Sequence, residues 1–308
     1  MNDRPATREE FVAELQRVRP ELHRYCARMT GSTAEGEDVV QDTLEKALAE
    51  WSPGNQSPPL RPWLFRIAHN RAIDSLRRYE RRMSAPLEDG MEISDDERGQ
   101  PESVAARRQA IATAVSTFLE LVPLQRSCVV LKDVLDYSLE EIADLFSISV
   151  AAVKSALHRG RARLKELGEP PRPQAQAAIH PLLMRYALLF DAHDWDGVRS
   201  LLAEDVRLEV VDRWRKSGRI EVGSYYANYS RLAGWRAIPG WLDGRPAIGL
   251  YFGADACRPT SFIVVEHDQD GVRFIRDYFH VPYMAEDARF VRSSSAQTLP
   301  RSSVLKGR

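Results

Sequence analysis

The sequence predicts a multidomain protein in which two all-α domains are followed by one α+β domain. The 308 residues exceed one typical domain of about 150 residues. Apolar residues recur every three or four positions up to about residue 167, whereas strand-like runs begin near residue 206. Two stretches without this periodicity divide the chain. The expected domains are 8–82, 104–167 and 178–284, joined by linkers 83–103 and 168–177 and followed by a tail, 285–308, expected to be disordered.

The first domain is expected to be a helical bundle with one basic wall. Residues 8–30 have the apolar spacing of an amphipathic helix, and Ser32 with Glu35 is typical of a capping box that opens a second helix. A proline-rich loop at 51–62 leads to a long helix over 63–82. One face of that helix is apolar. The opposite face carries Arg66, Asn70, Asp74, Arg77, Arg78 and Arg81.

The second domain contains two short predicted helices, 139–146 and 150–165, joined by a tight turn. Ser138 and Glu141 form a second expected capping box, and Ser149 caps the following helix. A helix-turn-helix is built this way, and its second helix enters a DNA major groove about 12 Å wide. A solvated helical hairpin whose basic residues serve solubility has the same spacing, so spacing alone leaves both interpretations open.

Charge is segregated along the chain, although the formal net charge is only -1. Basic residues concentrate at 61–82 and 154–165, and acidic residues at 35–50, 88–102 and 133–144. A near-neutral total therefore does not exclude a nucleic-acid-binding protein.

The composition is that of a globular protein, with 44% hydrophobic and 28% charged residues. No run approaches the ~18 consecutive apolar residues of a membrane span, and the N-terminus lacks an apolar signal region. We therefore expect a cytoplasmic protein without a membrane partner. Cys26, Cys128 and Cys257 lack metal-ligand spacing and are expected to be buried apolar residues. No cofactor or metal is expected.

The two helical domains resemble regions 2 and 4 of the extracytoplasmic-function (ECF) sigma factors of bacterial RNA polymerase. Region 2 is similar to EDVVQDTLEKA followed by RPWLFRIAHNRAIDSLRR, and region 4 to SLEEIADLFSISVAAVKSALHRGRARL. The motifs occur in the family's order and cover about residues 8–167. The resemblance implies a non-enzymatic sigma factor that binds core RNA polymerase and directs promoter recognition and transcription initiation.

The resemblance assigns three binding surfaces, and for the first of them a solvated helix face is the alternative. The clamp helices of the polymerase β′ subunit would meet Asp38, Gln41, Asp42 and Glu45. The minus-10 element, opened as a single strand, would contact Arg61, Trp63, Arg66, Asn70, Arg77 and Arg78, of which Trp63 also suits a core position. The minus-35 element would contact Lys154, Ser155, His158, Arg159 and Arg161, and only some of these would read bases. The acidic linker would thread toward the polymerase active-site cleft or serve as a plain tether.

The third domain resembles the SnoaL-like branch of the nuclear-transport-factor-2 fold, a cone of curved sheet with a pocket. The motifs are MRYALLFDAHDWDGVRSLLAEDVRLEV, GRPAIGLY and FIRDYFHV. Two helices, 179–192 and 195–202, are expected before strands at 206–211, 247–252, 261–267 and 272–280. The candidate pocket residues are Tyr186, Trp214, Tyr229, Trp241, His267, Asp277 and His280.

Three functional hypotheses follow. The first is a sigma factor whose C-terminal domain docks on the sigma core and regulates it in cis. Sigma factors fused to this domain are a known subclass, in which the extension is thought to substitute for a separate anti-sigma protein. The second is a ligand-sensing helix-turn-helix regulator, which would have no use for the region 2 helix pair. The third is a SnoaL-like cyclase or isomerase with a DNA-binding part, which requires an acid and a base that converge. Strand alternation instead puts Asp277 and His280 on opposite faces.

Overall fold

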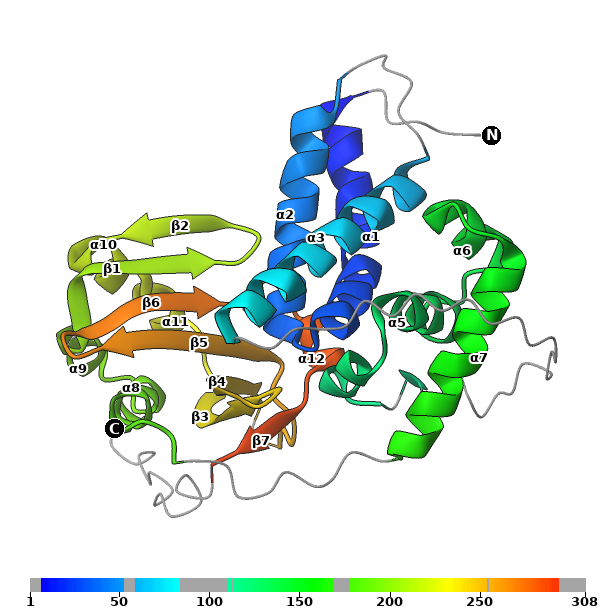
Figure 1. The fold of residues 1–308 in the computed structure, drawn as a ribbon. Helices are drawn as coiled ribbons and strands as arrows, with labels where there is room; N and C mark the ends of the chain where they lie inside the picture. The colour runs from blue at the N-terminus through cyan, green and yellow to red at the C-terminus, as the bar shows by residue number, and fades with distance from the viewer. Residues whose placement is uncertain are drawn as a thin grey trace. The chain divides into compact units, whose positions relative to one another are not determined.

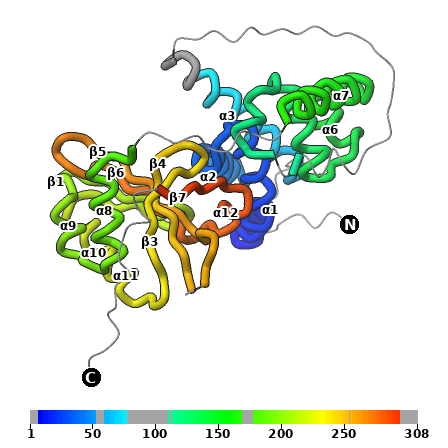
Figure 2. Tube along the Cα trace, turned by 90° about the horizontal axis from the view of Figure 1, so that it is seen from below, coloured from blue at the N-terminus to red at the C-terminus, as the bar shows by residue number. Residues whose placement is uncertain are grey.

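The computed structural model of the chain forms two compact units, one all-α and one α+β, which divide between Arg172 and Pro173 (Figure 1 and Figure 2). The side chains of residues 78–83 are not described. The residues that the structure describes are 7–52, 59–83, 110–111, 113–168, 178–253 and 255–293. The predicted combination of helical and α+β parts is confirmed.

Three long helices lie side by side in the first unit (Figure 1). They are α1 (Arg8–Thr30), α2 (Thr33–Glu50) and α3 (Leu60–Met83). Gly31, at φ +75°, ends α1, and the Ser32 hydroxyl then accepts a hydrogen bond from the Glu35 amide at 3.4 Å. A Cβ atom at Gly36 would lie 2.5 Å from the Ala27 backbone nitrogen. This glycine therefore permits the close approach of α1 and α2.

The described residues of the second half of the first unit, from 110 on, contain four short elements and one longer helix. They are the 3₁₀ helix η1 (Val115–Glu120), α5 (Pro123–Val129), the π-helical turn η2 (Val130–Val134), α6 (Leu139–Phe146) and α7 (Val150–Leu167). Pro123 lies in the first turn of α5, where a proline lacks only an amide hydrogen that has no helical partner. The capping box of Ser138 with Glu141 is confirmed. Ser149 also caps α7 as predicted, accepting from the Ala152 amide at 3.1 Å.

The two helical domains share one hydrophobic core, whereas the sequence predicted two separately tethered domains. The Phe65 ring of α3 packs edge-on against Tyr25 of α1 and against Tyr137, with 5.4 Å between ring centroids in each pair. Periodicity identifies the apolar face of each helix but not the helix that packs against it. The shared core could therefore not be predicted from the sequence.

The second unit is a seven-stranded sheet with helices packed against it (Figure 1). Its helices are α8 (Pro181–Asp191), α9 (Trp195–Ser200), α10 (Arg219–Tyr225), α11 (Ala227–Ser230) and α12 (Met284–Asp287). Its strands are β1 (Leu202–Val210), β2 (Trp214–Ser217), β3 (Trp235–Leu242), β4 (Arg245–Phe252), β5 (Ser261–Asp268), β6 (Gly271–Asp277) and β7 (Phe290–Arg292). The strand order is β2-β1-β6-β5-β4-β3-β7, and β1 and β6 run parallel.

Strands β2, β3 and β7 were not predicted. Strand β3 contains Pro239 and Gly240, which obscure its pattern. A Cβ atom at Gly240 would lie 2.6 Å from the Phe290 ring, so glycine at this position makes room for β7 to pair with β3. Phe290 also packs against Phe262, with 5.7 Å between ring centroids. The sheet therefore continues past residue 284, and the expectation of a disordered tail is wrong for residues 285–293.

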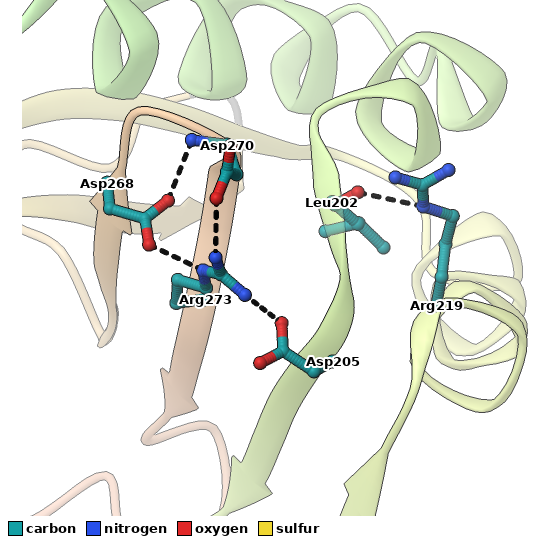
Figure 3. A network of polar contacts seen from close by, with 6 residues as sticks. All are labelled: Leu202, Asp205, Arg219, Asp268, Asp270 and Arg273. Atoms are coloured by element: carbon teal, nitrogen blue, oxygen red, sulfur yellow. Dashed lines mark hydrogen bonds and ion pairs between the residues drawn. The ribbon is translucent and has the colours of Figure 1, made fainter.

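A cluster of ionic contacts fastens β1 to the β5–β6 hairpin (Figure 3). The guanidinium of Arg273 pairs with the carboxylates of Asp205 on β1, Asp268 and Asp270. Nearby, Arg219 Nε donates a hydrogen bond to the Leu202 carbonyl at 2.8 Å. The register of the β1–β6 pair shifts directly after Leu202, so these contacts organise an irregular end of the sheet.

Cys26 and Cys128 are fully buried, as expected, whereas Cys257 is exposed and the expectation is wrong for it. Among the helices of the described residues, none combines the length and apolar character needed to cross a membrane.

Candidate nucleic-acid interface

The helix-turn-helix consists of α6, a turn that contains Ser147 at φ +56°, and α7. Val153, Leu157 and Gly160 face the core of the first unit. Lys154 and His158 are exposed, and Ser155, Arg159 and Arg161 are half-buried. All five minus-35 candidates thus lie outside the core, and α7 presents a basic outer surface.

Two arginines of α7 make different contacts within the protein. Arg159 Nη1 donates to the Ser155 hydroxyl at 2.9 Å. Arg161 donates from Nε and Nη2 to the two carboxylate oxygens of Asp133, at 2.9 and 2.5 Å. Asp133 was not predicted as part of the site. Its carboxylate is almost entirely buried. The one sequence signal for it is the position of an acidic residue within a largely apolar stretch.

The candidate minus-10 residues of α3 lie on its outer side. Arg66, Asn70 and Arg77 are exposed, and Trp63 is half-buried and packs against the core. The Arg61 guanidinium at the start of α3 pairs with Glu21 of α1 at 3.0 Å and keeps more than half of its side-chain surface exposed. The side chain of Arg78 lies outside the described residues.

The candidate polymerase-binding residues follow one side of α2. Asp42 and Glu45 are exposed, and Asp38 and Gln41 are half-buried. The Gln41 amide donates to Glu45 at 3.3 Å. This side of α2 has three carboxylates within eight residues and is the acidic counterpart of the basic face of α3.

A polar cluster joins the two halves of the first unit. The Tyr25 hydroxyl lies 2.9 Å from His69 Nδ1 and 3.1 Å from the Ser127 hydroxyl, and the Ser127 hydroxyl lies 3.2 Å from the same His69 nitrogen. These three groups come from α1, α3 and α5. Burial lowers the pKa of His69 from 6.5 to about 4, so the imidazole is neutral near pH 7.

Arg126 makes a second connection between the halves. Its Nη1 donates to the Met29 carbonyl at 2.6 Å, and its Nη2 donates to the Leu121 carbonyl at 2.8 Å. Arg126 is only 4% exposed. Its guanidinium therefore donates to carbonyl groups near the end of α1 and before α5.

The candidate pocket residues of the second unit do not all come together. Asp277 is fully buried and accepts hydrogen bonds from the hydroxyls of Tyr225 and Tyr229 and from the Phe279 amide. Tyr186 lies nearby in the same core and pairs with Tyr226, with 3.1 Å between hydroxyls. Burial raises the pKa of Asp277, against the lowering effect of the tyrosine hydrogen bonds. Tyr226 was not among the candidates.

The remaining pocket candidates lie elsewhere. His267 stacks on His180, with ring centroids 4.1 Å apart, and His280 is exposed. Trp214 is 38% exposed on the edge strand β2, and Trp241 of β3 is half-buried. Strand β6 ends at Asp277, so His280 lies beyond the strand to which the predicted alternation was applied.

The first unit has the geometry of a helix-turn-helix DNA-binding protein with a second basic surface on a neighbouring helical bundle. Residues 15–82 match the protein family "Sigma-70 region 2", and residues 116–164 match the family "Sigma-70, region 4". The ECF RNA polymerase sigma factor SigM of Mycobacterium tuberculosis is 31% identical over 161 residues, which cover 52% of this chain and 78% of SigM. The chain belongs to the ECF sigma factor family.

The similarity to some relatives extends beyond the sigma regions. The ECF RNA polymerase sigma factor SigG of M. tuberculosis is 29% identical over 302 residues, covering 87% of this chain and 80% of SigG. The crystal structure of M. tuberculosis SigJ matches 86% of this chain and 95% of its own, with 20% identity and a TM-score of 0.34. The prediction of an RNA polymerase sigma factor that acts in transcription initiation is confirmed.

Proposed function

We propose that this sigma factor uses three separate surfaces of its first unit: α2 for the polymerase, α3 for the minus-10 element and α7 for the minus-35 element. The observation that carries the proposal is the separation of two exposed basic faces, one on α3 and one on α7. A promoter has two recognition elements, and each face has the charge that a DNA backbone attracts.

The α2 surface suits the clamp helices of the β′ subunit. Asp42 and Glu45 are exposed, and an acidic-polar surface gains binding rate and specificity from a basic partner. Reversing both charges, with Asp42→Lys and Glu45→Lys, is expected to weaken binding to core polymerase at least tenfold. Replacing Glu9, an exposed acid of α1, and Glu14, a half-buried one, with lysine makes the same change of charge and is expected to leave the binding intact.

The α3 surface suits an unstacked single strand. Arg66 and Arg77 are exposed cations, and Asn70 between them supplies an amide that donates and accepts hydrogen bonds. Arg61 is assigned to the same surface, and the family resemblance adds Arg78 to the candidates. Run-off transcription with core polymerase tests this assignment: the double variant Arg66→Ala/Arg77→Ala should open promoter DNA poorly, as measured by permanganate reactivity of the minus-10 region.

Arg17 offers a matched control. Its side chain is 74% exposed on α1 and pairs with Glu14, so Arg17→Ala removes a surface arginine outside the proposed surface. Promoter opening by Arg17→Ala should equal that of the unaltered protein. Equal opening by the Arg66→Ala/Arg77→Ala variant would refute the α3 assignment.

We further propose that the second unit docks on the sigma core and regulates it in cis. Only residues 169–177 separate the described parts of the two units, and such a short tether raises the effective concentration toward millimolar. Weak complementary surfaces are then occupied most of the time. Truncation after Leu167 should leave binding to core polymerase but change the transcript yield. Equal yields with and without residues 168–308, at matched folded concentrations, would refute this role.

The buried Asp277 cluster supports a packing role for the core of the second unit. Both Asp277 oxygens accept hydrogen bonds from the protein itself, from Tyr225 and Tyr229 on one oxygen and the Phe279 amide on the other. The exposed His280 does not share this burial. The proposed contribution of the second unit is therefore regulatory binding, without a catalytic step.

A further inference from the structure

The outer surface of α7 has two edges that differ in their internal contacts. At 100° per residue, Ser155 and Arg159 lie within 40° of each other around the helix, because they are four residues apart. Arg161 lies about 160° from Arg159 by the same reckoning. A single helix in a major groove therefore presents the two guanidinium groups to different sides of the groove.

The Arg161 edge is anchored to the protein. Asp133 of η2 is only 3% exposed at its side chain, and its two oxygens take up both Nε and Nη2 of Arg161. These two nitrogens form one of the two bidentate edges of a guanidinium, and this edge can also recognise guanine. If Arg161 left Asp133 to contact a base, the buried Asp133 carboxylate would lose its partner. The cost of an unpaired buried charge strongly disfavours this change of partner.

The Arg159 edge is arranged differently. The Ser155 hydroxyl accepts from Nη1 of Arg159, so this contact does not use the Nε and Nη2 pair. Ser155 lies one turn closer to the N-terminal end of α7. In a helix-turn-helix, this end contacts the base edges. The hydrogen bond to Ser155 therefore holds the Arg159 guanidinium toward the base-reading end of the helix.

We propose that Ser155 is a positioning residue that orients Arg159 to read a guanine of the minus-35 element, while Asp133 withholds Arg161 from base reading. The inference rests on the proposed contact between α7 and the minus-35 element. On this proposal, the Arg159 edge of α7 reads the DNA sequence, and the Arg161 edge holds α7, the recognition helix, against η2.

The test uses the full chain with core polymerase and a library of promoters randomised across the minus-35 element, with base preferences taken from sequenced transcripts. Arg159→Ala should abolish the preference for guanine at one position. Ser155→Ala should weaken the same preference about 3- to 10-fold, a part of the discrimination of a bidentate contact. Ser155→Thr retains the hydroxyl and should restore the preference. Ser155→Ala should add nothing in an Arg159→Ala background.

The Arg161 edge is tested with a neutral pair, because Arg161→Ala alone would leave Asp133 buried and unpaired. The double variant Asp133→Asn/Arg161→Gln keeps two groups that can hydrogen-bond to each other. Its base preferences should match those of the unaltered protein at every position, even where its total yield falls. A changed preference at any position would show that Arg161 reads a base and would overturn the proposal.

Two other outcomes separate the inference from the function on which it rests. If Ser155→Ala changes the preference at a position that Arg159→Ala leaves intact, Ser155 contacts DNA itself and the positioning role is refuted. If the unaltered holoenzyme transcribes the whole library equally, α7 does not read a minus-35 element. That result refutes the proposed α7 surface and, with it, the inference.

Discussion

The Tyr25 hydroxyl of α1 lies 3.1 Å from the Ser127 hydroxyl of α5, and this contact joins region 2 to region 4 within a single core. His69 Nδ1 lies within hydrogen-bonding distance of both hydroxyls. A polar cluster at the centre of an interface favours one arrangement of its helices over others, because any other arrangement leaves its donors and acceptors unpaired.

Tyr25→Phe removes one hydroxyl from this cluster with little change in shape. Ser127 and His69 remain paired with each other, so we expect the free energy of opening at the region 2–region 4 contact to fall by about 1 kcal/mol. Hydrogen exchange of the α5 amides measures this opening. Protection of α5 equal to that of the unaltered protein would mean that the Tyr25 hydroxyl does not stabilise the contact.

The same cluster predicts a pH dependence. The pKa of His69 is lowered to about 4 in the folded protein, below the ordinary value of 6.5, so between these values the folded state binds fewer protons than the unfolded state. The contribution of His69 to stability is full above pH 6.5 and is lost as the pH falls toward 4. The protection factors of the α3 and α5 amides, which correct for the slower intrinsic exchange at low pH, should fall over this range, and His69→Gln should flatten the dependence. An unchanged slope in His69→Gln would contradict the prediction.

The effect of Gly160→Ala on stability should depend on the size of the neighbouring side chain, Val129. Alanine at position 160 would bring a Cβ atom to 2.7 Å from Val129 Cγ2, so Gly160→Ala should lower the free energy of unfolding by about 1 kcal/mol despite its better helix propensity. In a Val129→Ala background the clash disappears. Gly160→Ala should then stabilise by up to about 1 kcal/mol. Urea unfolding of the four variants gives this comparison, and the same sign in both backgrounds would contradict the steric explanation.

Asp277 predicts the opposite pH dependence in the second unit. Its pKa is raised by burial, so above the ordinary aspartate value the folded state binds more protons than the unfolded state. Its contribution to stability is full at low pH and is lost as the pH rises through the raised pKa. Asp277→Asn should therefore gain stability relative to the unaltered protein as the pH rises above 4. Exchange of the β6 amides measures this difference, and a difference that does not vary with pH would contradict the prediction.

The sequence was most informative where local chemistry decides the structure. Ser138 with Glu141, and Ser149, mark the helix starts at which the structure confirms caps. Apolar periodicity identified the inward side of α3, where Phe65 and Ala72 are buried. These features depend on residues within one or two helical turns, so a single sequence carries them.

Contacts between distant segments were beyond the sequence. Tyr25 and Ser127 are 102 residues apart, and no pattern within either helix indicates that they meet. Strand β3 was missed because Pro239 and Gly240 break its pattern, and β7 because a three-residue strand offers too few positions to show alternation. The binding assignments for α2, α3 and α7 came from family resemblance and stay predictions.

The contact between α3 and α6 has a consequence for the engaged promoter. His69 of α3 packs edge-on against Phe146 at the end of α6, with 4.9 Å between ring centroids. The minus-10 and minus-35 elements lie about 25 base pairs apart, on the order of 85 Å along B-form DNA. On the proposed assignments, α3 and α6 must separate at this contact when one molecule binds both elements. Tyr25, Ser127 and His69 are then exposed to water. Their polar atoms can form hydrogen bonds with water, which lowers the free-energy cost of exposing this buried contact.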